Sequence, residues 1–478
     1  MLFDTAIYYV FLTLVVVTYW LLTRRGQNVL LLIASYFFYG WWDWRFLSLI
    51  LISTVVDFFC ARFIARSHDV VARRSLLTLS VALNLGFLGF FKYFNFFADS
   101  FSQLMAQLGI EVSHTVIQVV LPPGISFYTF QALAYIVDVY HRRLEPADSL
   151  IDYALFISFF PHLIAGPIQR PSHLLPQVQN PRRADPDRFF DGLMLIASGL
   201  FRKCVIADNC ALLADAAFDG KLGAPSVAVV AIGAYAFAWQ IYGDFSGYTD
   251  IARGSAQLMG FHFMVNFRQP YLSTSLQDFW RRWHISLSTW LRDYLYIALG
   301  GNREGERKTY RNLMLTMLIG GLWHGANWTF VVWGAIHGLG LSLERFARNV
   351  LRLRRSELKG IEEAGPVHSS AWISRIAVFH IVCLGWIFFR ASSLTEAVHF
   401  LSGLGRFTWI PEYGIAFQFL AAFALPMFLL DCLNEWRNEE YPLAHSPAAI
   451  RVAAAMLLVV GTSLFAGNTA NAFIYFQF

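Results

Sequence analysis

Charged residues are scarce in this sequence, and their total does not indicate a nucleic-acid partner. Of the 478 residues, 14% are charged and 56% are hydrophobic, which departs from the composition of soluble globular domains. The formal net charge is only +5, so no nucleic-acid partner is expected. The placement of Lys and Arg carries more information than their total. The composition predicts an integral membrane protein.

Motifs of soluble enzymes and of metal sites are also missing. No GxSxG elbow, Walker loop, dinucleotide fingerprint or HExxH pair occurs, which leaves the familiar soluble chemistries without their usual residues. The five cysteines form no CxxC pair and no metal-ligand spacing. No metal site is therefore predicted, and burial as small apolar side chains is the expected role of these cysteines. They are Cys60, Cys204, Cys210, Cys383 and Cys432.

Long apolar runs dominate the sequence instead. Several reach the ~20 residues that a spanning helix needs, and they are continuously apolar rather than alternating, which favours helices over a β-barrel. The first run has no basic stretch before it and no small-residue cleavage site after it, so a retained helix is expected. The runs are Phe3–Leu22, Val29–Gly40, Phe46–Ile64, Leu76–Phe91, Ile125–Tyr140, Ala228–Ile241, Ile373–Phe389, Ile415–Leu430 and Ala448–Phe465. Without a soluble domain, linker or repeat, one membrane-embedded domain is predicted over residues 1–478.

Basic residues mark one side of the predicted membrane helices. Arg24 and Arg25 follow the first apolar run, and further arginines follow the third. Because cytoplasmic loops carry an excess of Lys and Arg, these loops are predicted to be cytoplasmic and the N-terminus to lie outside. The basic segments 266–312 and 345–370 are placed in the cytoplasm by the same rule. The rule does not predict on which side of the membrane the proline-containing loop 169–188 lies.

The stretch GGLWHGANWTFVVWGAIHG, residues 320–338, lies between those two basic segments. Only 32 residues, 313–344, separate the segments, whereas two full spans would need about 40. A hairpin of short helices that enters the membrane and returns is therefore predicted. Its break is expected at one of three glycines: Gly320, Gly321 or Gly325.

Two histidines in this stretch, His324 and His337, are unusual for a membrane segment. An ionisable side chain there is a functional hypothesis by default, and the break would set His324 at depth, buried in protein or lining a cavity. On one uninterrupted helix the two would be turned about 220° apart, so either the helix breaks or they do different jobs. The alternative is packing, in which a histidine donates to a carbonyl of a neighbouring helix.

A further candidate, His284, lies in the segment QDFWRRWHISLSTWLRDYLY, residues 277–296. Apolar side chains recur there at steps of three and four, and the opposite side carries arginines such as Arg281 and Arg292. This pattern predicts an interfacial amphipathic helix. His284 follows Trp280 by four residues and so lies beside the buried stripe. An interface anchor with an incidental histidine is the alternative.

Three more polar residues interrupt apolar sequence. Asp244 and Asp250, in YGDFSGYTDIARG (residues 242–254), are able to orient a histidine, bind an Arg, or cap a helix that begins near Tyr248. Capping is the commoner role for Asp. His162, in FFPHLIAGPIQRP, indicates a helix break at a membrane face.

The order of these motifs resembles that of the membrane-bound O-acyltransferase family. The matching stretches are GISFYTFQALAYIVDVY, FFPHLIAGPIQRP, YGDFSGYTDIARG, FWRRWHISLSTWLRDYLYIALGGNR and LWHGANWTFVVWGAIHG. The likeness covers nearly the whole chain and is greatest to the bacterial branch, whose members serve alginate, cellulose, peptidoglycan and teichoic acid. It implies an all-α polytopic fold with roughly 11–12 spanning helices plus short re-entrant and interfacial helices.

The resemblance also implies site residues and a reaction. The family's essential histidine, in its LWHG motif, falls on His324, and its second histidine falls on His284 in the RRWH motif. The implied reaction is acetyl transfer from a cytoplasmic thioester, either acetyl-CoA or an acyl carrier protein, for O-acetylation of an exported polysaccharide such as alginate. No permanently bound cofactor is implied. Basic residues near the interfacial helix would hold the donor's phosphates, or merely follow the positive-inside rule. They are Arg281, Arg282, Arg303, Arg307 and Lys308.

The implied protein is a multi-pass enzyme of the bacterial inner membrane that works with a periplasmic acetyltransferase partner. Burial disfavours imidazolium, so a neutral His324 is expected to accept the proton of the attacking hydroxyl. His284 would orient the nucleophile or polarise the thioester carbonyl. The alternatives are another cell-envelope polymer as acceptor, or a non-catalytic transporter or secretion-complex subunit. A transporter would be expected to show repeat-related halves, and none is evident.

Overall fold

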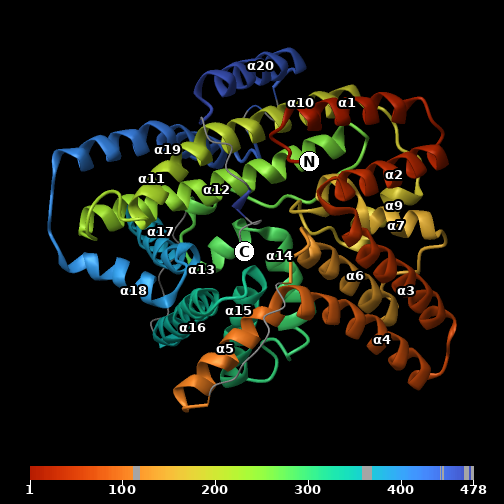
Figure 1. Ribbon diagram of the computed structural model, residues 1–478, viewed down its shortest axis with the longest axis horizontal. Coiled ribbons are helices and arrows are strands. Elements are labelled where there is room, and N and C mark those ends of the chain that lie inside the picture. The colour runs from red at the N-terminus through yellow and green to blue at the C-terminus, as the bar shows by residue number, and fades with distance from the viewer. Residues whose placement is uncertain (111–118, 358–368, 442, 444–445, 468–472, 475–478) are drawn as a thin grey trace. The chain divides into compact units, whose positions relative to one another are not determined.

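The computed structural model describes the chain except residues 111–118, 358–368, 442, 444–445, 468–472 and 475–478. Residues 358–368 of the predicted basic segment 345–370 therefore lie outside the described residues. Every regular element in the described part of the chain is helical (Figure 1), which confirms the all-α class.

The contacts between residues divide the chain into two compact units. Unit 1 comprises Met1–Leu200, Tyr248–Met264 and Pro447–Leu458, and unit 2 comprises Phe201–Gly247, Val265–Ser446 and Val459–Phe478. Two helices contribute to both units, namely α12 (Val227–Gln257) and α20 (Ala448–Phe465).

The remaining elements each belong to one unit. Those of unit 1 are α1 (Ala6–Trp20), α2 (Arg24–Asp43), η1 (Trp44–Phe46), α3 (Leu47–Arg66), α4 (Val70–Leu88), η2 (Gly89–Tyr93), α5 (Phe94–Gln107), α6 (Ile125–Tyr140), α7 (Leu150–Ser158), α8 (Phe160–Leu163), α9 (Pro171–Gln179) and α10 (Pro186–Leu200). Those of unit 2 are η3 (Phe201–Ala207), α11 (Asp208–Phe218), η4 (Pro270–Leu272), α13 (Leu276–Arg282), α14 (Ile285–Trp290), η5 (Leu291–Tyr296), α15 (Glu306–His324), α16 (Trp328–Glu357), α17 (Ser369–Arg390), α18 (Leu394–Ser402), η6 (Gly403–Gly405) and α19 (Pro411–Arg437).

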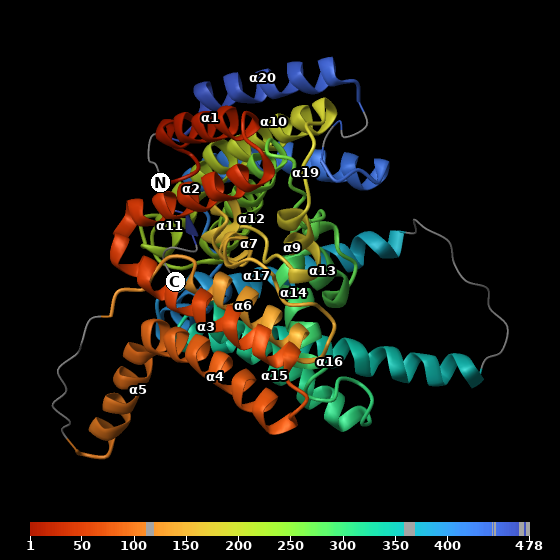
Figure 2. The ribbon, with the colours of Figure 1, turned by 90° about the vertical axis from the view of Figure 1, so that its right-hand side faces the viewer.

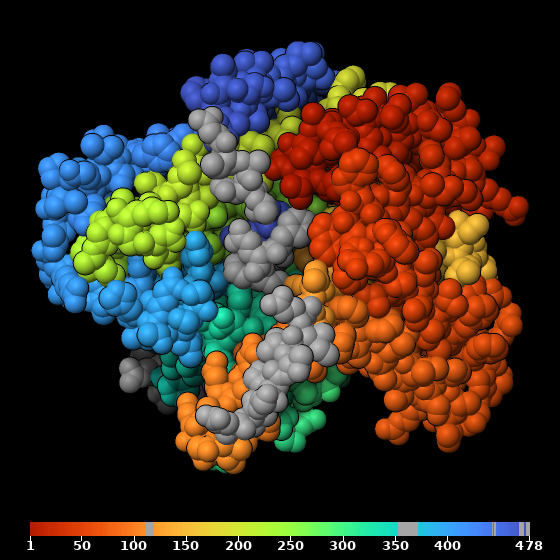
Figure 3. Space-filling model, viewed as in Figure 1, coloured from red at the N-terminus to blue at the C-terminus, as the bar shows by residue number. Residues whose placement is uncertain are grey.

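Six stretches of the described chain are long and apolar enough to cross a membrane, so this is a multi-pass membrane protein. They are Arg24–Arg66, Val70–Gln107, Val227–Gln257, Ala371–Arg390, Pro411–Arg437 and Ala448–Phe465. Large apolar side chains on such helices are exposed, as on α19, where Ile415 is 66% exposed. Helix α19 contributes to the blue surface at the left of Figure 3. The six stretches do not correspond one to one with the roughly 11–12 expected spans, because Arg24–Arg66 and Val70–Gln107 each contain more than one helix. Helices such as α1 and α6, with 15 and 16 residues, fall below the length of a full span.

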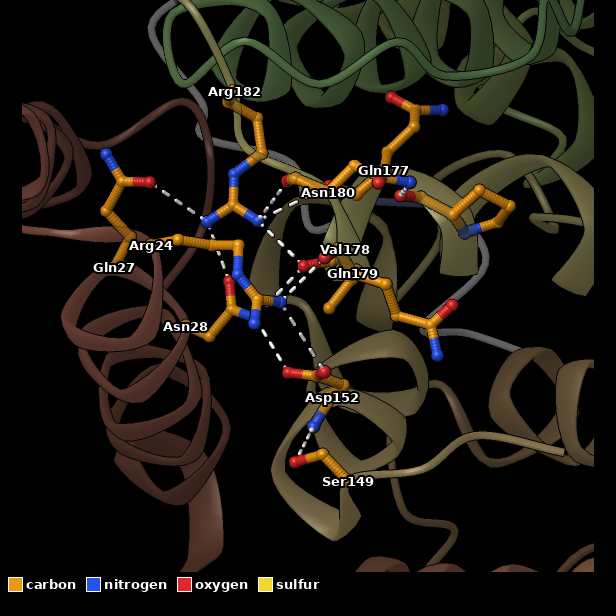
Figure 4. Close-up of polar contacts among 11 residues, drawn as sticks. Arg24, Gln27, Asn28, Ser149, Asp152, Gln177, Val178, Gln179, Asn180 and Arg182 are labelled. Atoms are coloured by element: carbon orange, nitrogen blue, oxygen red, sulfur yellow. Dashed lines mark hydrogen bonds and ion pairs between the residues drawn. The ribbon is translucent and has the colours of Figure 1, made fainter.

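A polar network in unit 1 ties the start of α2 to the end of α9 and the loop after it (Figure 4). Arg24 donates from Nη1 to the carbonyl oxygen of Gln179 at 2.6 Å. Arg182 donates from Nη2 to Oδ1 of Asn28, also at 2.6 Å. These contacts place this part of the loop 169–188 beside the α1–α2 turn. The sequence left the side of this loop open. We now expect the loop to lie on the same side of the membrane as Arg24, which is predicted to be cytoplasmic.

In unit 2, α15 and α16 form the predicted hairpin and lie side by side (Figures 1 and 2). The structure confirms a break at Gly325, whose backbone is extended (φ −155°, ψ 147°). A Cβ atom at Gly325 would overlap the ring of Phe330, so only glycine fits there. Both helices are longer than expected, at 19 and 30 residues. The reason is that α15 begins inside the preceding polar segment and α16 continues past Glu344.

The prediction of one helix over residues 277–296 is wrong, because the chain turns sharply at His284. This residue adopts the left-handed conformation (φ 44°, ψ 53°) between α13 and α14, and η5 then continues as a π-helix. Helical periodicity assumes a regular backbone, which a left-handed residue interrupts. The apolar stripe is nevertheless buried, since Trp283 and Leu287 are both 0% exposed.

The prediction that an aspartate caps a helix beginning near Tyr248 is also wrong, since Tyr248 lies inside the 31-residue helix α12. Asp244 instead lies 3.0 Å from Nζ of Lys203, within unit 2. Asp250 lies 3.5 Å from Arg253 one turn later, within unit 1. Both carboxylates thus pair with cationic side chains, which is what buried charges require.

Candidate active site

Two of the predicted site residues, His284 and His324, come together in unit 2. Their ring centroids lie 6.2 Å apart, with 58° between the ring planes. Their exposed fractions are 0% and 3%. His284 stands at the junction of α13 and α14, and His324 is the last residue of α15. The fold therefore brings two buried imidazoles from separate segments to one place.

Aromatic rings surround His324. The ring centroids of Trp323 and Trp333 lie 5.0 Å from its imidazole, and that of Phe389 lies 5.4 Å away. The helix ends at His324 because Gly325 leaves the helical conformation. Three aromatic rings of the described residues thus pack around the imidazole of His324.

His284 is held by a residue that the motifs did not single out, Asn266. The Nδ1 atom of His284 lies 3.2 Å from Oδ1 of Asn266, and the Asn266 side chain is fully buried. Burial lowers the pKa of His284 to about 3, so this imidazole is neutral at physiological pH. The ring of Phe245 packs edge-on against it at 4.7 Å. Sequence reasoning missed Asn266 because an isolated Asn carries no motif.

Asp244, the residue that precedes Phe245, belongs to a buried ion cluster. Nζ of Lys203 lies 2.8 Å from Oδ1 of Asp208 and 3.0 Å from Oδ1 of Asp244. Oδ2 of Asp244 also accepts a hydrogen bond from the backbone N–H of Ile474 at 2.7 Å. Sequence reasoning missed this cluster, although a lysine and an aspartate five residues apart in the apolar stretch FRKCVIAD are a usable signal.

A cavity of about 420 Å³ opens beside the α13–α14 segment. Its lining is mostly apolar and includes Ile285, the residue that directly follows His284, together with Trp280. Four arginines also line it: Arg281, Arg292, Arg345 and Arg348. An apolar cavity with several cationic groups suits a ligand that carries both an apolar part and phosphates.

The five basic residues predicted to hold the donor have different surroundings. Arg281 lines the cavity. Arg282 is instead paired with Glu435 at 2.7 Å, and Lys308 is paired at 2.7 Å with a carboxylate one turn earlier. Arg303 and Arg307 are exposed. The structure therefore brings one of the five to the cavity, and adds three arginines that the prediction did not contain. These three are also paired with carboxylates: Arg292 with Asp293, Arg345 with Glu306 and Arg348 with Glu344.

His337 lies on the other helix of the hairpin and is 0% exposed. Its ring stacks on Phe279 at 6.0 Å and contacts Trp280 and Trp333 at 5.2 and 4.9 Å. Because the chain breaks at Gly325, the two histidines of this stretch belong to different helices, and Trp333 contacts both.

His162 belongs to unit 1, where it is 1% exposed on the short helix α8. Its Nδ1 atom lies 3.2 Å from Nε2 of Gln131 on α6. This contact and its burial among aromatic rings give His162 a packing role inside unit 1.

Two closely spaced imidazoles can carry out proton transfer at a hydroxyl group. One can accept the proton while the other holds the reacting group by a hydrogen bond. The surrounding aromatic side chains exclude water, which strengthens each polar interaction in the site.

Comparisons with known proteins relate the whole chain to acyltransferases. The model of the MBOAT, or membrane-bound O-acyltransferase, family matches residues 37–357. The chain is 38% identical to the probable alginate O-acetylase AlgI of Azotobacter vinelandii, with all of both chains aligned. It is 43% identical to the protein of the same name from Pseudomonas aeruginosa, over 86% of this chain and 76% of the relative. It is 38% identical to the peptidoglycan O-acetyltransferase of Helicobacter pylori, over 84% and 80%.

Proposed function

Since this chain belongs to the membrane-bound O-acyltransferase family and is an O-acyltransferase, we propose that it transfers acetyl groups from a cytoplasmic thioester for O-acetylation of an exported polysaccharide. Alginate is the first candidate, because relatives aligned over most or all of this chain are named alginate O-acetylases. Peptidoglycan is the second candidate, which the Helicobacter pylori relative supports.

The buried pair of His284 and His324 is the observation that carries this proposal. His324 takes the proton of the acceptor hydroxyl as its oxygen attacks the thioester carbonyl carbon. The C–S bond then breaks, and the leaving sulfur takes the proton from His324, so an ester and a thiol are the products. His284 orients the nucleophile or polarises the carbonyl during the attack.

The acyl donor is proposed to bind in the 420 Å³ cavity. Acetyl-CoA and an acyl carrier protein both present phosphate next to a thioester arm, and arginine binds phosphate in a bidentate manner. Arg281 lines the cavity, which supports its proposed role as a phosphate ligand. The other predicted donor-binding residues, Arg282, Arg303, Arg307 and Lys308, would attract the donor electrostatically.

The enzyme is proposed to lie in the bacterial inner membrane with its N-terminus outside. The loop that carries Arg24 and the loop joined to it through Arg182 would then both face the cytoplasm. A periplasmic acetyltransferase is proposed as the partner that completes the transfer to the polymer.

Acetyl transfer in proteoliposomes tests the proposal. Labelled acetyl-CoA, or the same thioester on an acyl carrier protein, is supplied on one side, and labelled polysaccharide is measured in the presence of the partner. At equal amounts of folded protein, His324→Gln should lower the rate at least ~100-fold. His337→Gln, which changes an equally buried histidine of the same hairpin, should leave most of the rate.

Three other results would contradict the proposal. Equal rates for wild type and His324→Gln would exclude His324 as the base. Loss of folded protein in His324→Gln would return this residue to a packing role. Failure of the wild type to transfer from either donor, with polymer export intact, would favour the alternative of a transporter or secretion subunit.

A further inference from the structure

Asn266 binds the imidazole of His284 and the two residues that follow it, Ile285 and Ser286. Its backbone carbonyl accepts from the N–H of Ile285 at 2.9 Å. Its side-chain Oδ1 accepts from the backbone N–H and the hydroxyl of Ser286, at 3.2 and 2.9 Å. A left-handed conformation is strained for a residue with a Cβ atom and persists only where its surroundings impose it. Asn266 supplies these surroundings.

The same contacts fix which atom of the Asn266 amide faces His284. The backbone N–H of Ser286 can only donate, so the atom that it meets must be the amide oxygen. That oxygen also lies 3.2 Å from Nδ1 of His284. Because an oxygen of this kind can only accept, Nδ1 must carry the proton. In a neutral imidazole the lone pair then resides on Nε2.

We propose that Asn266 is a positioning residue that fixes His284 as its Nδ1–H tautomer, so that His284 acts in acyl transfer as a hydrogen-bond acceptor. This rests on the proposed function. Nε2 accepts a hydrogen bond from a second O–H group of the acceptor molecule, and this holds the attacking hydroxyl beside His324, which takes the proton of that hydroxyl. Polarising the thioester carbonyl would need a donor at Nε2, which this tautomer lacks. Of the two roles open to His284, the hydrogen bond with Asn266 selects orientation of the nucleophile.

Asn266→Asp separates these roles because they respond in opposite directions. The aspartate keeps an oxygen for the Ser286 N–H, and its charge favours imidazolium at His284. An imidazolium donates and cannot accept. If His284 acts as an acceptor, Asn266→Asp should transfer at least ~10-fold more slowly near neutral pH, and the acid limb of its rate profile should move to higher pH. If His284 polarises the carbonyl, the rate should be equal or higher.

Asn266→Ala provides a second variant, and Asn434→Ala is the control. Alanine removes the side-chain acceptor without adding charge, so the rate should fall at every pH with no shift of the acid limb. Asn434 is a fully buried asparagine of the same unit, on α19, that makes none of these contacts. Its replacement should leave rate and profile unchanged at equal amounts of folded protein.

Parallel assays of His324→Gln distinguish failure of this inference from failure of the proposed function. If His324→Gln is inactive while both Asn266 variants match the wild type in rate and pH profile, the role of Asn266 is overturned and the proposed function stands. If His324→Gln transfers normally, the proposed function fails and this inference fails with it. If Asn266→Asp does not fold, the rate and profile of Asn266→Ala decide alone.

Discussion

Nζ of Lys203 lies 3.0 Å from Oδ1 of Asp244, and the two side chains are 5% and 4% exposed. Asp208 lies on the other side of the ammonium group, at 2.8 Å. One lysine therefore compensates two carboxylates in the interior of unit 2. The pairing connects η3 and α11 to Asp244 in the middle of α12. The residue after Asp244, Phe245, packs against His284.

Lys203→Met is expected to destabilise the protein by about 3–5 kcal/mol, because it removes a buried ammonium group that contacts two buried carboxylates. Chemical unfolding in detergent micelles measures the change. Lys221→Met is the matched control, since Lys221 forms an exposed pair with Asp219 at 2.8 Å. Its loss should leave the free energy of unfolding nearly unchanged, because water and salt screen an exposed ion pair. Equal losses in the two variants would contradict a structural role for the buried cluster.

Gly325→Ala is expected to destabilise the hairpin by about 1–3 kcal/mol and to lower acetyl transfer, because the new methyl group would overlap the ring of Phe330 and displace His324. Gly86→Ala is the control, as nothing lies within 4 Å of a Cβ atom there. In the interior of α4 that change should stabilise by about 1 kcal/mol. Wild-type stability and transfer in Gly325→Ala would show that the break tolerates a side chain.

Stability should depend on pH through His284. Burial lowers its pKa to about 3 in the folded state, whereas an unfolded histidine has a pKa of about 6.5. The contribution of His284 to the free energy of unfolding is therefore complete above pH ~6.5. It is lost as the pH falls toward ~3, by at most ~1.4 kcal/mol per pH unit. The free energy of unfolding, measured in detergent from about pH 7 to 5, should fall less steeply in His284→Gln. Identical slopes would contradict this.

Arg281→Gln is expected to raise KM for the acyl donor about 10-fold while leaving kcat largely unchanged, because a lost charged hydrogen bond to phosphate weakens binding rather than chemistry. Steady-state transfer with varied acetyl-CoA measures both constants. Arg66→Gln removes an exposed charge at the end of α3, far along the sequence from the cavity. If both variants raise KM equally, the arginines act through their general charge and not through the cavity.

Local sequence patterns predicted the parts of the site that depend on local chemistry. Three glycines, Gly320, Gly321 and Gly325, indicated a helix break, and the structure has it at Gly325, directly after His324. The apolar stripe around His284 correctly indicated burial. The same stripe gave the wrong backbone, because periodicity does not register a single left-handed residue.

The remaining features depend on contacts between residues distant in sequence. Asn266 meets His284 across 18 positions, and Lys203 meets Asp244 across 41. Neither pair has a spacing that a helix or turn would explain, so only the folded chain reveals them. The arginines of the cavity likewise come from two basic segments, Arg281 and Arg292 from 266–312 and Arg345 and Arg348 from 345–370, and only the folded chain shows that they line one cavity.

The close approach of α15 and α16 also sets a register. A Cβ atom on Gly321 would stand only 3.3 Å from the Cα atom of Gly334. The two backbones are therefore in contact at this point, and no space is left between them for a side chain. Sliding α15 by one helical turn would shift His324 by about 5.4 Å, close to the full 6.2 Å that separates it from His284. The register of α15 on α16 therefore fixes the position of His324. A slip of a single turn would move its imidazole too far from that of His284 for both to contact one acceptor molecule.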